Sequence, residues 1–204
     1  MTLWEFDKEI KSESKATLLC GVDEAGRGPL AGDVYAAAVV FSDDVIIDGI
    51  NDSKKLSEKK REALFDEIKE KASAYCIATA SVFEIEELNI LNAAMLAMKR
   101  AVEGLSVTPE IVLIDGNKIP DILPKAVSVV KGDAKSQSVA AASILAKVAR
   151  DRYMKEMDKK YPEYQFAKHK GYGTKLHYEM VDKYGLCDIH RPSFFKKYFD
   201  KKNG

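Results

Sequence analysis

Short apolar runs alternate with longer amphipathic segments along the chain, which is typical of an α/β protein. The runs are rich in Val, Ile, Leu and Ala and have the lengths of strands rather than helices. The second run follows the first too closely for a helical crossover, so we expect these two strands to pair antiparallel. The predicted strands cover residues 16–22, 33–41, 74–82, 111–114 and 127–130.

Helical periodicity and capping residues predict helices between and after these strands. Ser57 is placed as an N-cap, and Leu64, Phe65 and Ile68 form an apolar stripe behind it. The longest predicted helix begins with small apolar residues and ends in alternating charge, so we expect it to enter the core first and leave it later. We expect helices after Ser57 and over residues 84–89, 91–102, 136–161 and 174–184.

Two acids and a run of glycines follow one another within residues 21–32. Asp23 and Glu24 fall at the carboxyl end of the first predicted strand, where open α/β sheets place their chemistry. The glycines let the backbone approach a ligand closely, and together with Arg27 they can bring N–H groups and a guanidinium against a phosphate or sugar. A tight turn with two solvated acids is the alternative, because turns are rich in Gly, Pro and Asp.

Two further acids end apolar runs in the same way, Asp115 after the fourth run and Asp133 after the fifth. One sheet could therefore gather Asp23, Glu24, Asp115 and Asp133 at one end. Like charges at close range raise carboxylate pKa values, whereas hard divalent cations prefer oxygen ligands. Two Mg²⁺ ions about 3.5–4 Å apart would activate a water and stabilise the leaving oxygen of a phosphodiester. Asp151 is a rival acid, which we place in the helix body, paired with Arg150 or Arg152.

Other chemistries are poorly supported by the sequence. Cys20, Cys76 and Cys187 are widely spaced without a C-x-x-C pair, so we expect three small buried hydrophobes rather than a disulfide framework or a zinc site. The three histidines are confined to the last quarter of the chain and no G-x-S-x-G motif occurs, which argues against a Ser-His-Asp hydrolase.

The charge balance hides a split between the two parts of the chain. The net charge is zero, but residues 147–204 carry 15 Lys or Arg against 8 Asp or Glu, a net of +7, which leaves −7 on residues 1–146. An acidic body beside a basic tail suits a metal site that holds a polyanion, although such runs are also common on solvated faces. The cations and aromatics of residues 189–199 fit either a nucleic-acid backbone or a packed tail. Lys54 is placed to meet a phosphate, or is an ordinary surface lysine.

At 204 residues and 46% hydrophobic content the chain can bury a full core, as one domain with an appendage or at most two small ones. The first residues lack a signal-type apolar stretch, and no apolar run approaches the roughly 18 residues that span a bilayer. We therefore expect a cytoplasmic protein.

Taken together, these motifs resemble the bacterial type 2 ribonucleases H, also called ribonuclease HII. The similarity extends over nearly the whole chain, and the set of motifs is far more specific than any one of them. It rests on residues 23–32 (DEAGRGPLAG), 52–56 (DSKKL), 114–116 (IDG), 131–135 (KGDAK), 138–151, 170–174 (KGYGT) and 190–194 (HRPSF).

The resemblance implies a ribonuclease H-like fold, a mixed five-stranded sheet flanked by helices, with a catalytic domain over residues 1–160 and a helical carboxyl-terminal extension over residues 161–204. It implies an endonuclease that hydrolyses the RNA strand of RNA–DNA hybrids and nicks DNA duplexes on the 5′ side of embedded ribonucleotides, leaving 3′-hydroxyl and 5′-phosphate ends. These duplexes are the expected partners, and we expect a monomer that binds no membrane.

The resemblance also implies roles for individual residues. The catalytic and metal-binding residues, for two Mg²⁺ or Mn²⁺ ions, would be Asp23, Glu24, Asp115 and Asp133. The ribose would be recognised by Gly26, Arg27, Gly28 and Tyr172, and we expect Lys54 and Arg191 to contact phosphate. The chain departs from the family pattern at Asp33, where proline is common, and at Pro192, where a second basic residue is common; Pro192 weakens one possible phosphate contact.

Two other functions remain open from the sequence. A junction resolvase or another ribonuclease H-like nuclease would use similar acids, but has no need of a ribose-recognising Gly-Arg-Gly loop. A hybrid-binding module with a degenerate site would not need all four carboxylates, and this chain retains them.

Overall fold

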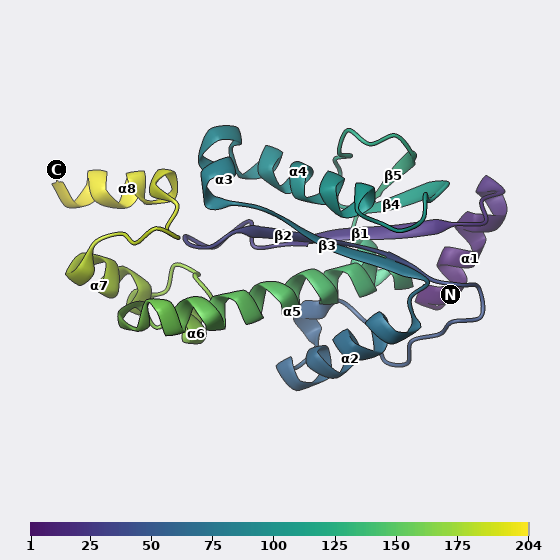
Figure 1. Ribbon diagram of the computed structural model, residues 1–204, viewed down its shortest axis with the longest axis horizontal. Coiled ribbons are helices and arrows are strands. Elements are labelled where there is room, and N and C mark those ends of the chain that lie inside the picture. The colour runs from purple at the N-terminus through teal and green to yellow at the C-terminus, as the bar shows by residue number, and fades with distance from the viewer. Residues whose placement is uncertain (204) are drawn as a thin grey trace.

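The computed structural model describes residues 1–203 and contains one mixed sheet covered by helices on both faces (Figure 1). The sheet has five strands in the order β3-β2-β1-β4-β5. β1 pairs antiparallel with β2, as predicted, and β2 pairs antiparallel with β3, whereas β4 runs parallel to both β1 and β5. The strands are β1 Leu19–Ala25, β2 Val34–Val40, β3 Ala74–Ala80, β4 Ile111–Asp115 and β5 Lys125–Val129. The predicted mixed five-stranded sheet flanked by helices is confirmed.

Ser57 is an N-cap, as predicted, and the helices expected from residues 136 and 174 are also capped by their first expected residue. The side chains of Ser57, Ser136 and Thr174 each accept a hydrogen bond from a backbone N–H of the first turn that follows. The helices are α1 Leu3–Ser14, α2 Glu58–Lys71, α3 Val82–Leu88, α4 Ile90–Glu103, α5 Gln137–Lys160, α6 Phe166–His169, α7 Lys175–Tyr184 and α8 Pro192–Asn203. Three 3₁₀ turns occur at η1 Ser53–Lys55, η2 Gly132–Ala134 and η3 Pro162–Tyr164.

Successive residues of β2 contribute to two separate cores. Ala36 and Ala38 pack on the face covered by α3 and α4, whereas Ala37 and Val39 pack on the face covered by α2 and α5 (Figure 1). α5 approaches β1 so closely that a Cβ atom on Gly21 would lie 2.1 Å from the backbone carbon of Ser138. The small side chains that begin α5 are therefore needed for the helix to lie on the sheet, and they carry it past the acidic end of β1.

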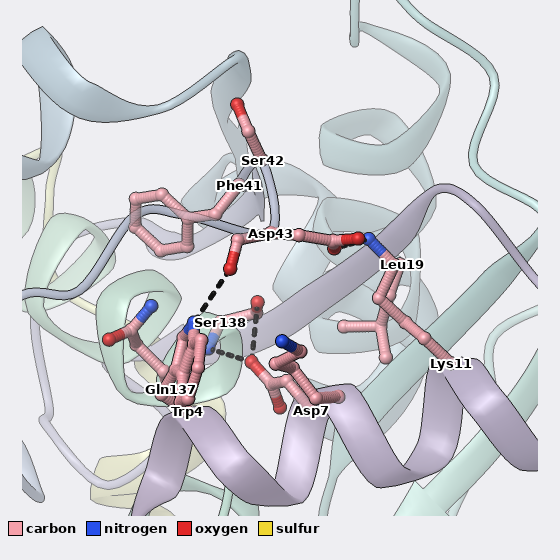
Figure 2. A pocket seen from close by; sticks show the side chains of 10 residues that line it. Trp4, Asp7, Lys11, Leu19, Phe41, Ser42, Asp43, Gln137 and Ser138 are labelled. Carbon is pink, nitrogen blue, oxygen red and sulfur yellow. Dashed lines mark hydrogen bonds and ion pairs between the residues drawn. The ribbon is translucent and has the colours of Figure 1, made fainter.

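Helix α1, which the sequence did not predict, docks against the start of α5 (Figure 2). Asp7 Oδ2 accepts hydrogen bonds from the backbone N and from Oγ of Ser138, both at 2.8 Å. The Trp4 indole donates to the backbone oxygen of Asp43 at 3.0 Å. Burial raises the pKa of Asp7, despite the hydrogen bonds from Ser136 and Ser138. These contacts fix the amino end of α5, the helix that carries much of the cleft wall.

The carboxyl-terminal segment folds as α6, α7 and α8 around the far end of α5. Its core contains Phe166 and Phe195, together with Met154 of α5 and with Leu30 and Ala31 of the glycine-rich loop. The loop and the tail are thus packed into one cluster, with α8 and α1 at opposite ends of the molecule (Figure 1). Gly204, the last residue of the predicted extension, lies outside the described residues.

All three cysteines are free, as expected, although Cys20 alone is fully buried and the other two are partly exposed. No helix within residues 1–203 is both long enough and apolar enough to cross a bilayer.

Candidate active site

Asp23 of β1 and Asp115, the last residue of β4, lie next to each other on two parallel strands. Val22 of β1 is paired with Ile114 of β4, so the following residue of each strand stands at the same level. The sequence placed Asp23 and Glu24 after a strand ending at residue 22, and this was wrong. β1 continues to Ala25, because its pairing with β2 extends three residues beyond Val22.

Asp133 is brought to the same place by the turn between β5 and α5. Lys131 adopts a left-handed conformation (φ 57°) before η2, and the N–H of Gly132 donates to Asp115 Oδ1 at 2.6 Å. The Asp133 side chain is largely buried, 7% exposed as a residue. Burial, and then the charges of Asp115 and Asp52, raise the pKa of Asp133. The turn therefore ties two of the predicted catalytic acids to one another.

The crowding of negative charge is most pronounced at Asp23. Burial, and then the charges of Glu24 and Asp115, raise its pKa well above the usual range. In the described part of the chain, no three His, Cys, Asp or Glu side chains are close enough in this arrangement to form a complete ligand set. The donor set is nevertheless chemically suited to a hard divalent cation, because it consists of carboxylate oxygens whose repulsion a positive charge would relieve.

Glu24 is the fourth predicted acid and has a cationic partner. Arg27 Nη1 lies 3.2 Å from Glu24 Oε1, in an ion pair between the end of β1 and the glycine-rich loop. The structure thus brings Asp23, Asp115 and Asp133 into electrostatic contact, and places Glu24 next to them with its carboxylate turned to Arg27.

A cleft of about 470 Å³ lies against Asp23 and Glu24. Most of the predicted substrate-binding residues line it, namely Gly26, Arg27, Gly28, Lys54 and Tyr172. The sequence analysis did not assign a substrate-binding role to five other lining residues, Ser53, Ile90, Ser143, Lys147 and Arg150. Lys147 and Arg150 stand three residues apart on α5, so the helical face that follows Ser143 was the available signal.

Lys54 is directed toward the acids by a tightly held turn. Asp52 accepts from the Lys54 backbone N at 2.9 Å, and Ser53 Oγ lies 2.9 Å from Ser143 Oγ of α5. Burial alone would lower the pKa of Lys54, but the carboxylates around it, above all those of Asp133 and Asp23, outweigh burial and raise that pKa. Lys54 is thus an exposed positive charge that lies beside the acids at one end of the cleft.

Tyr172 lines the cleft beside Gly28 of the glycine-rich loop. Its side chain is partly exposed, 45% as a residue, and a Cβ atom on Gly28 would lie 3.7 Å from its ring. The Lys147 amine lies 5.9 Å from the centre of the Tyr172 ring and 2.7 Å from Asp151 Oδ1. The predicted pairing of Asp151 with Arg150 or Arg152 was therefore wrong, because its partner lies one helical turn earlier.

Arg191 does not lie where a phosphate could reach it. Its side chain is fully buried, and all its hydrogen bonds go to backbone oxygens of the glycine-rich loop. The expected direct contact between Arg191 and substrate phosphate is thus wrong for this arrangement. The tertiary contacts give Arg191 backbone partners in place of the expected phosphate.

Fold and site together define a nuclease of the ribonuclease H-like class, with acids at the ends of neighbouring parallel strands and a glycine-rich loop beside them. Among solved structures, the chain is similar to ribonuclease H2 from Pyrococcus horikoshii OT3, with a TM-score of 0.73, 28% identity, and coverage of 86% of this chain and 93% of that one. This similarity agrees with the fold expected from the sequence.

Sequence comparison gives the particular family. The family model for ribonuclease HII matches residues 20–199. The chain is 55% identical over 193 residues to ribonuclease HII of Caldicellulosiruptor bescii, covering 95% of this chain and 93% of the relative. It is 62% identical over 178 residues to that of a Marinomonas species, covering 87% and 89%. The chain belongs to the ribonuclease HII family, and so is an endonuclease of the ribonuclease H type that degrades RNA in RNA–DNA hybrids.

Proposed function

We propose that this endonuclease also nicks DNA duplexes on the 5′ side of embedded ribonucleotides, and that it works with two divalent cations. The products carry 3′-hydroxyl and 5′-phosphate ends. The observation that carries this proposal is the placement of Asp23 and Asp115 side by side, next to a cleft lined by the Gly26–Gly28 loop and Tyr172. An acidic centre and a surface suited to sugar recognition therefore share one cleft.

In this proposal the four carboxylates act as negatively charged ligands for the cations. Asp23, Glu24, Asp115 and Asp133 would hold two Mg²⁺ or Mn²⁺ ions, which would supply an activated water and stabilise the charge on the leaving oxygen. Lys54 is charged and faces the same acids, so it can contact a phosphate oxygen next to the scissile bond. To act as a ligand, Glu24 would have to leave its present partner Arg27.

The ribose is recognised by the loop on the other wall of the cleft. A 2′-hydroxyl can both donate and accept a hydrogen bond, and it is the local difference between the two sugars. Backbone groups of Gly26, Arg27 and Gly28 can approach it, because the two glycines have no side chain to intervene. The Tyr172 ring, partly exposed beside Gly28, can pack on the following sugar. A hydroxyl-free sugar is favoured there, so an RNA-to-DNA junction is the preferred site.

Residues 161–204 serve in this proposal as a helical extension that holds the duplex, and residues 1–160 as the catalytic domain. Support comes from the aromatic cluster in which Phe166 and Phe195 of the extension pack against Leu30 and Ala31 of the loop. A duplex bound to the extension would therefore be positioned directly relative to the loop. The protein would act as a monomer in the cytoplasm.

The test is the cleavage of three labelled duplexes of one sequence: an RNA–DNA hybrid, a DNA duplex with one ribonucleotide, and an all-DNA duplex. The proposal expects Mg²⁺-dependent or Mn²⁺-dependent cleavage of the first two, with a single nick 5′ of the ribonucleotide and a phosphate on the downstream fragment. Equal cleavage of the all-DNA duplex, or cleavage that persists in EDTA, would contradict it.

A further inference from the structure

The guanidinium of Arg191 gathers the backbone oxygens of the glycine-rich loop around itself. Nη2 donates to the oxygen of Gly26 at 2.7 Å and to that of Gly32 at 2.6 Å. Nη1 donates to the oxygens of Arg27 at 3.2 Å and Pro29 at 2.7 Å, and Nε donates to that of Gly32 at 2.9 Å. One buried side chain thus contacts four peptide groups within seven residues of the loop.

This arrangement fixes the direction of the opposite face of the loop. In a trans peptide the C=O and N–H bonds point in opposite directions, and all peptide bonds of the described chain are trans. Since the Gly26 and Arg27 oxygens point at Arg191, the N–H groups of Arg27 and Gly28 point away from it. Neither N–H donates a hydrogen bond within residues 1–203, and both residues are exposed and line the cleft.

The next constrained peptide shows the same geometry. The Pro29 oxygen accepts from Arg191, while the N–H of Leu30, on the other side of that peptide group, donates to the oxygen of Gly171 at 2.8 Å. Gly171 directly precedes Tyr172, so the face of the loop turned away from Arg191 is the face turned toward Tyr172. The free N–H groups of Arg27 and Gly28 belong to peptide groups held by the same side chain.

A second buried guanidinium supports the loop from α5. Arg150 donates to the backbone oxygens of Ala31 at 2.9 Å, of Asp33 at 3.2 Å and of Lys170 at 3.0 Å. It occupies the space beside Gly26, where a Cβ atom would lie 2.2 Å from its Nε. Arg150 therefore joins the end of the glycine-rich loop to the turn that carries Tyr172.

Neither arginine forms an ion pair in the described structure, so both charges are satisfied by peptide oxygens. Burial, and then the charge of Arg150, lowers the pKa of Arg191 to about 9, which leaves the guanidinium charged at neutral pH. A lysine at the same place has three donors and no planar fork, so it cannot hold four oxygens in this geometry.

We propose that Arg191, with Arg150 as its support, is a positioning residue for ribonucleotide recognition: it turns the N–H groups of Arg27 and Gly28 into the cleft as a preformed pair of donors. The acceptor is an oxygen of the ribonucleotide, its 2′-hydroxyl or the adjoining phosphate. This role rests on the proposed recognition of embedded ribonucleotides and adds a residue that does not itself touch the substrate.

The test compares binding of two duplexes of one sequence, one all-DNA and one with a single ribonucleotide, in EDTA so that both remain intact. For Arg191→Lys and Arg150→Lys, the ratio of the two dissociation constants should fall about tenfold toward unity, roughly the worth of one hydrogen bond. Affinity for the all-DNA duplex and its salt dependence should stay as in the wild type. Arg152→Lys is the matched control, because Arg152 stands on α5 but pairs with the partly exposed Glu62.

Two results of the binding comparison would overturn the proposal. One is an unchanged ratio in a folded Arg191→Lys protein. The other is an equal loss of affinity for both duplexes with a shallower salt dependence, which would make Arg191 a phosphate contact. Arg191→Ala should also lower the ratio of the two dissociation constants, and added methylguanidinium should restore it. If Arg191 contributed to stability alone, Arg191→Ala would have the wild-type ratio without any addition.

Hydrogen exchange separates a failure of this inference from a failure of the proposed function. The N–H groups of Leu30 and Gly32 are bonded to the oxygens of Gly171 and Ile189 and should lose protection in Arg191→Lys. A loss of protection supports the positioning of the loop by Arg191, whatever the binding results. If the wild type does not distinguish the two duplexes, the proposed ribonucleotide recognition is refuted instead. Unchanged protection would overturn the positioning role.

Discussion

The guanidinium of Arg27 is paired with the carboxylate of Glu24 across 3.2 Å, so a residue proposed to contact the ribose is bonded to one proposed to bind a cation. Arg27 is about half exposed, and such a pair contributes at most about 1 kcal/mol. Arg27 nevertheless competes with any cation for the Glu24 carboxylate. The end of β1 therefore has two alternative partners for one carboxylate.

We expect Arg27→Ala to bind Mn²⁺ up to about fivefold more tightly, because Glu24 no longer has to leave its partner. Titration calorimetry without nucleic acid measures this directly. Arg152→Ala breaks a comparable ion pair with Glu62 and should leave Mn²⁺ affinity unchanged. Weaker Mn²⁺ binding by Arg27→Ala would contradict the competition.

Asp115→Asn should abolish cleavage without destabilising the cation-free protein. Burial, and then the charges of Glu24 and Asp115, raise the pKa of Asp23, so removing the Asp115 charge relieves part of the repulsion in this cluster. In the wild type, Mg²⁺ should raise the melting temperature by binding the folded state, and most of this increase should be lost in the variant. Asp121→Asn, at a fully exposed acid, is the control. Wild-type cleavage by Asp115→Asn would refute the site.

The strands could be predicted because each contains a compact apolar run, but the residues at which β1 begins and ends could not. The strand containing Asp23 was predicted three residues too early. Its last three residues are two acids and Ala25, which precede a glycine and carry no strand signal. What extends it is pairing with β2, a tertiary contact. Helix α1 was missed although its sequence carries a start signal, because Thr2 and Glu5 form a capping box and Phe6 and Ile10 pack against the core.

The acids of the site could be predicted because they end apolar runs, which is a local feature of the sequence. The contacts of the arginines could not. Arg191 in a motif with histidine and serine suggested a phosphate contact, but its partners are backbone oxygens some 160 positions earlier in the chain. Every residue has a backbone oxygen, so the sequence does not indicate which of them accept hydrogen bonds from Arg191. Only the fold shows these contacts.

The three histidines form a neutral buried network whose protonation should destabilise the protein. The Cys187 N–H donates to His190 Nδ1, so His190 Nε2 carries a proton and donates to His177 Nε2 at 3.0 Å. The other nitrogen of His177 then donates to the Tyr172 oxygen, while His169 stacks on the His177 ring. Burial first of all lowers the pKa of both His177 and His190 to about 4.

Below the unfolded value of 6.5, the unfolded chain therefore binds more protons than the folded one. The stability that these histidines contribute is fully present above about pH 6.5 and is lost as the pH falls toward 4. Denaturant unfolding between pH 7.5 and 4.5 should show this decline, and His190→Gln should make it shallower. All histidines of the chain belong to this network, so a decline of unchanged slope in the variant would refute it.

The exposed lysines of α8 provide a test of duplex binding by the extension. Deleting residues 186–204 is unsuitable as a test. The deletion would also remove the buried side chains of Arg191 and Phe195 and disrupt the cluster around them. A double change of Lys196 and Lys197 to Gln keeps the core intact, since both side chains are exposed. If both contact phosphates, the slope of log affinity against log salt should fall by roughly two.

The control for this change lies at the other end of the molecule. Lys8 and Lys15 belong to the α1 region, at the opposite end from α8 (Figure 1), and changing both to Gln removes the same charge. An equal effect of the two double variants would mean that net charge alone matters. No effect of the α8 variant would make the tail a packing element rather than a binding surface.

Tyr172 provides the sharpest test of junction recognition, because its backbone and its side chain have separate tasks. Its N–H donates to the His169 oxygen and its own oxygen accepts from His177, so the main chain holds the turn whatever the side chain is. The ring is partly exposed beside Gly28. Tyr172→Ala should therefore fold with nearly the stability of the wild type, yet lose most of its activity on a DNA duplex with one ribonucleotide.

The informative quantity is the ratio of single-ribonucleotide cleavage to all-RNA hybrid cleavage. Packing of the ring on a hydroxyl-free sugar favours the junction, so Tyr172→Ala should lower this ratio, whereas Tyr172→Phe keeps the ring and should preserve it. Arg191→Ala, which from sequence alone would be the phosphate-contact comparison, is unsuitable because Arg191 supports the loop itself. Were Tyr172 only a packing residue, the alanine variant would lose thermal stability and keep its ratio, and that pattern would reject junction recognition by the ring.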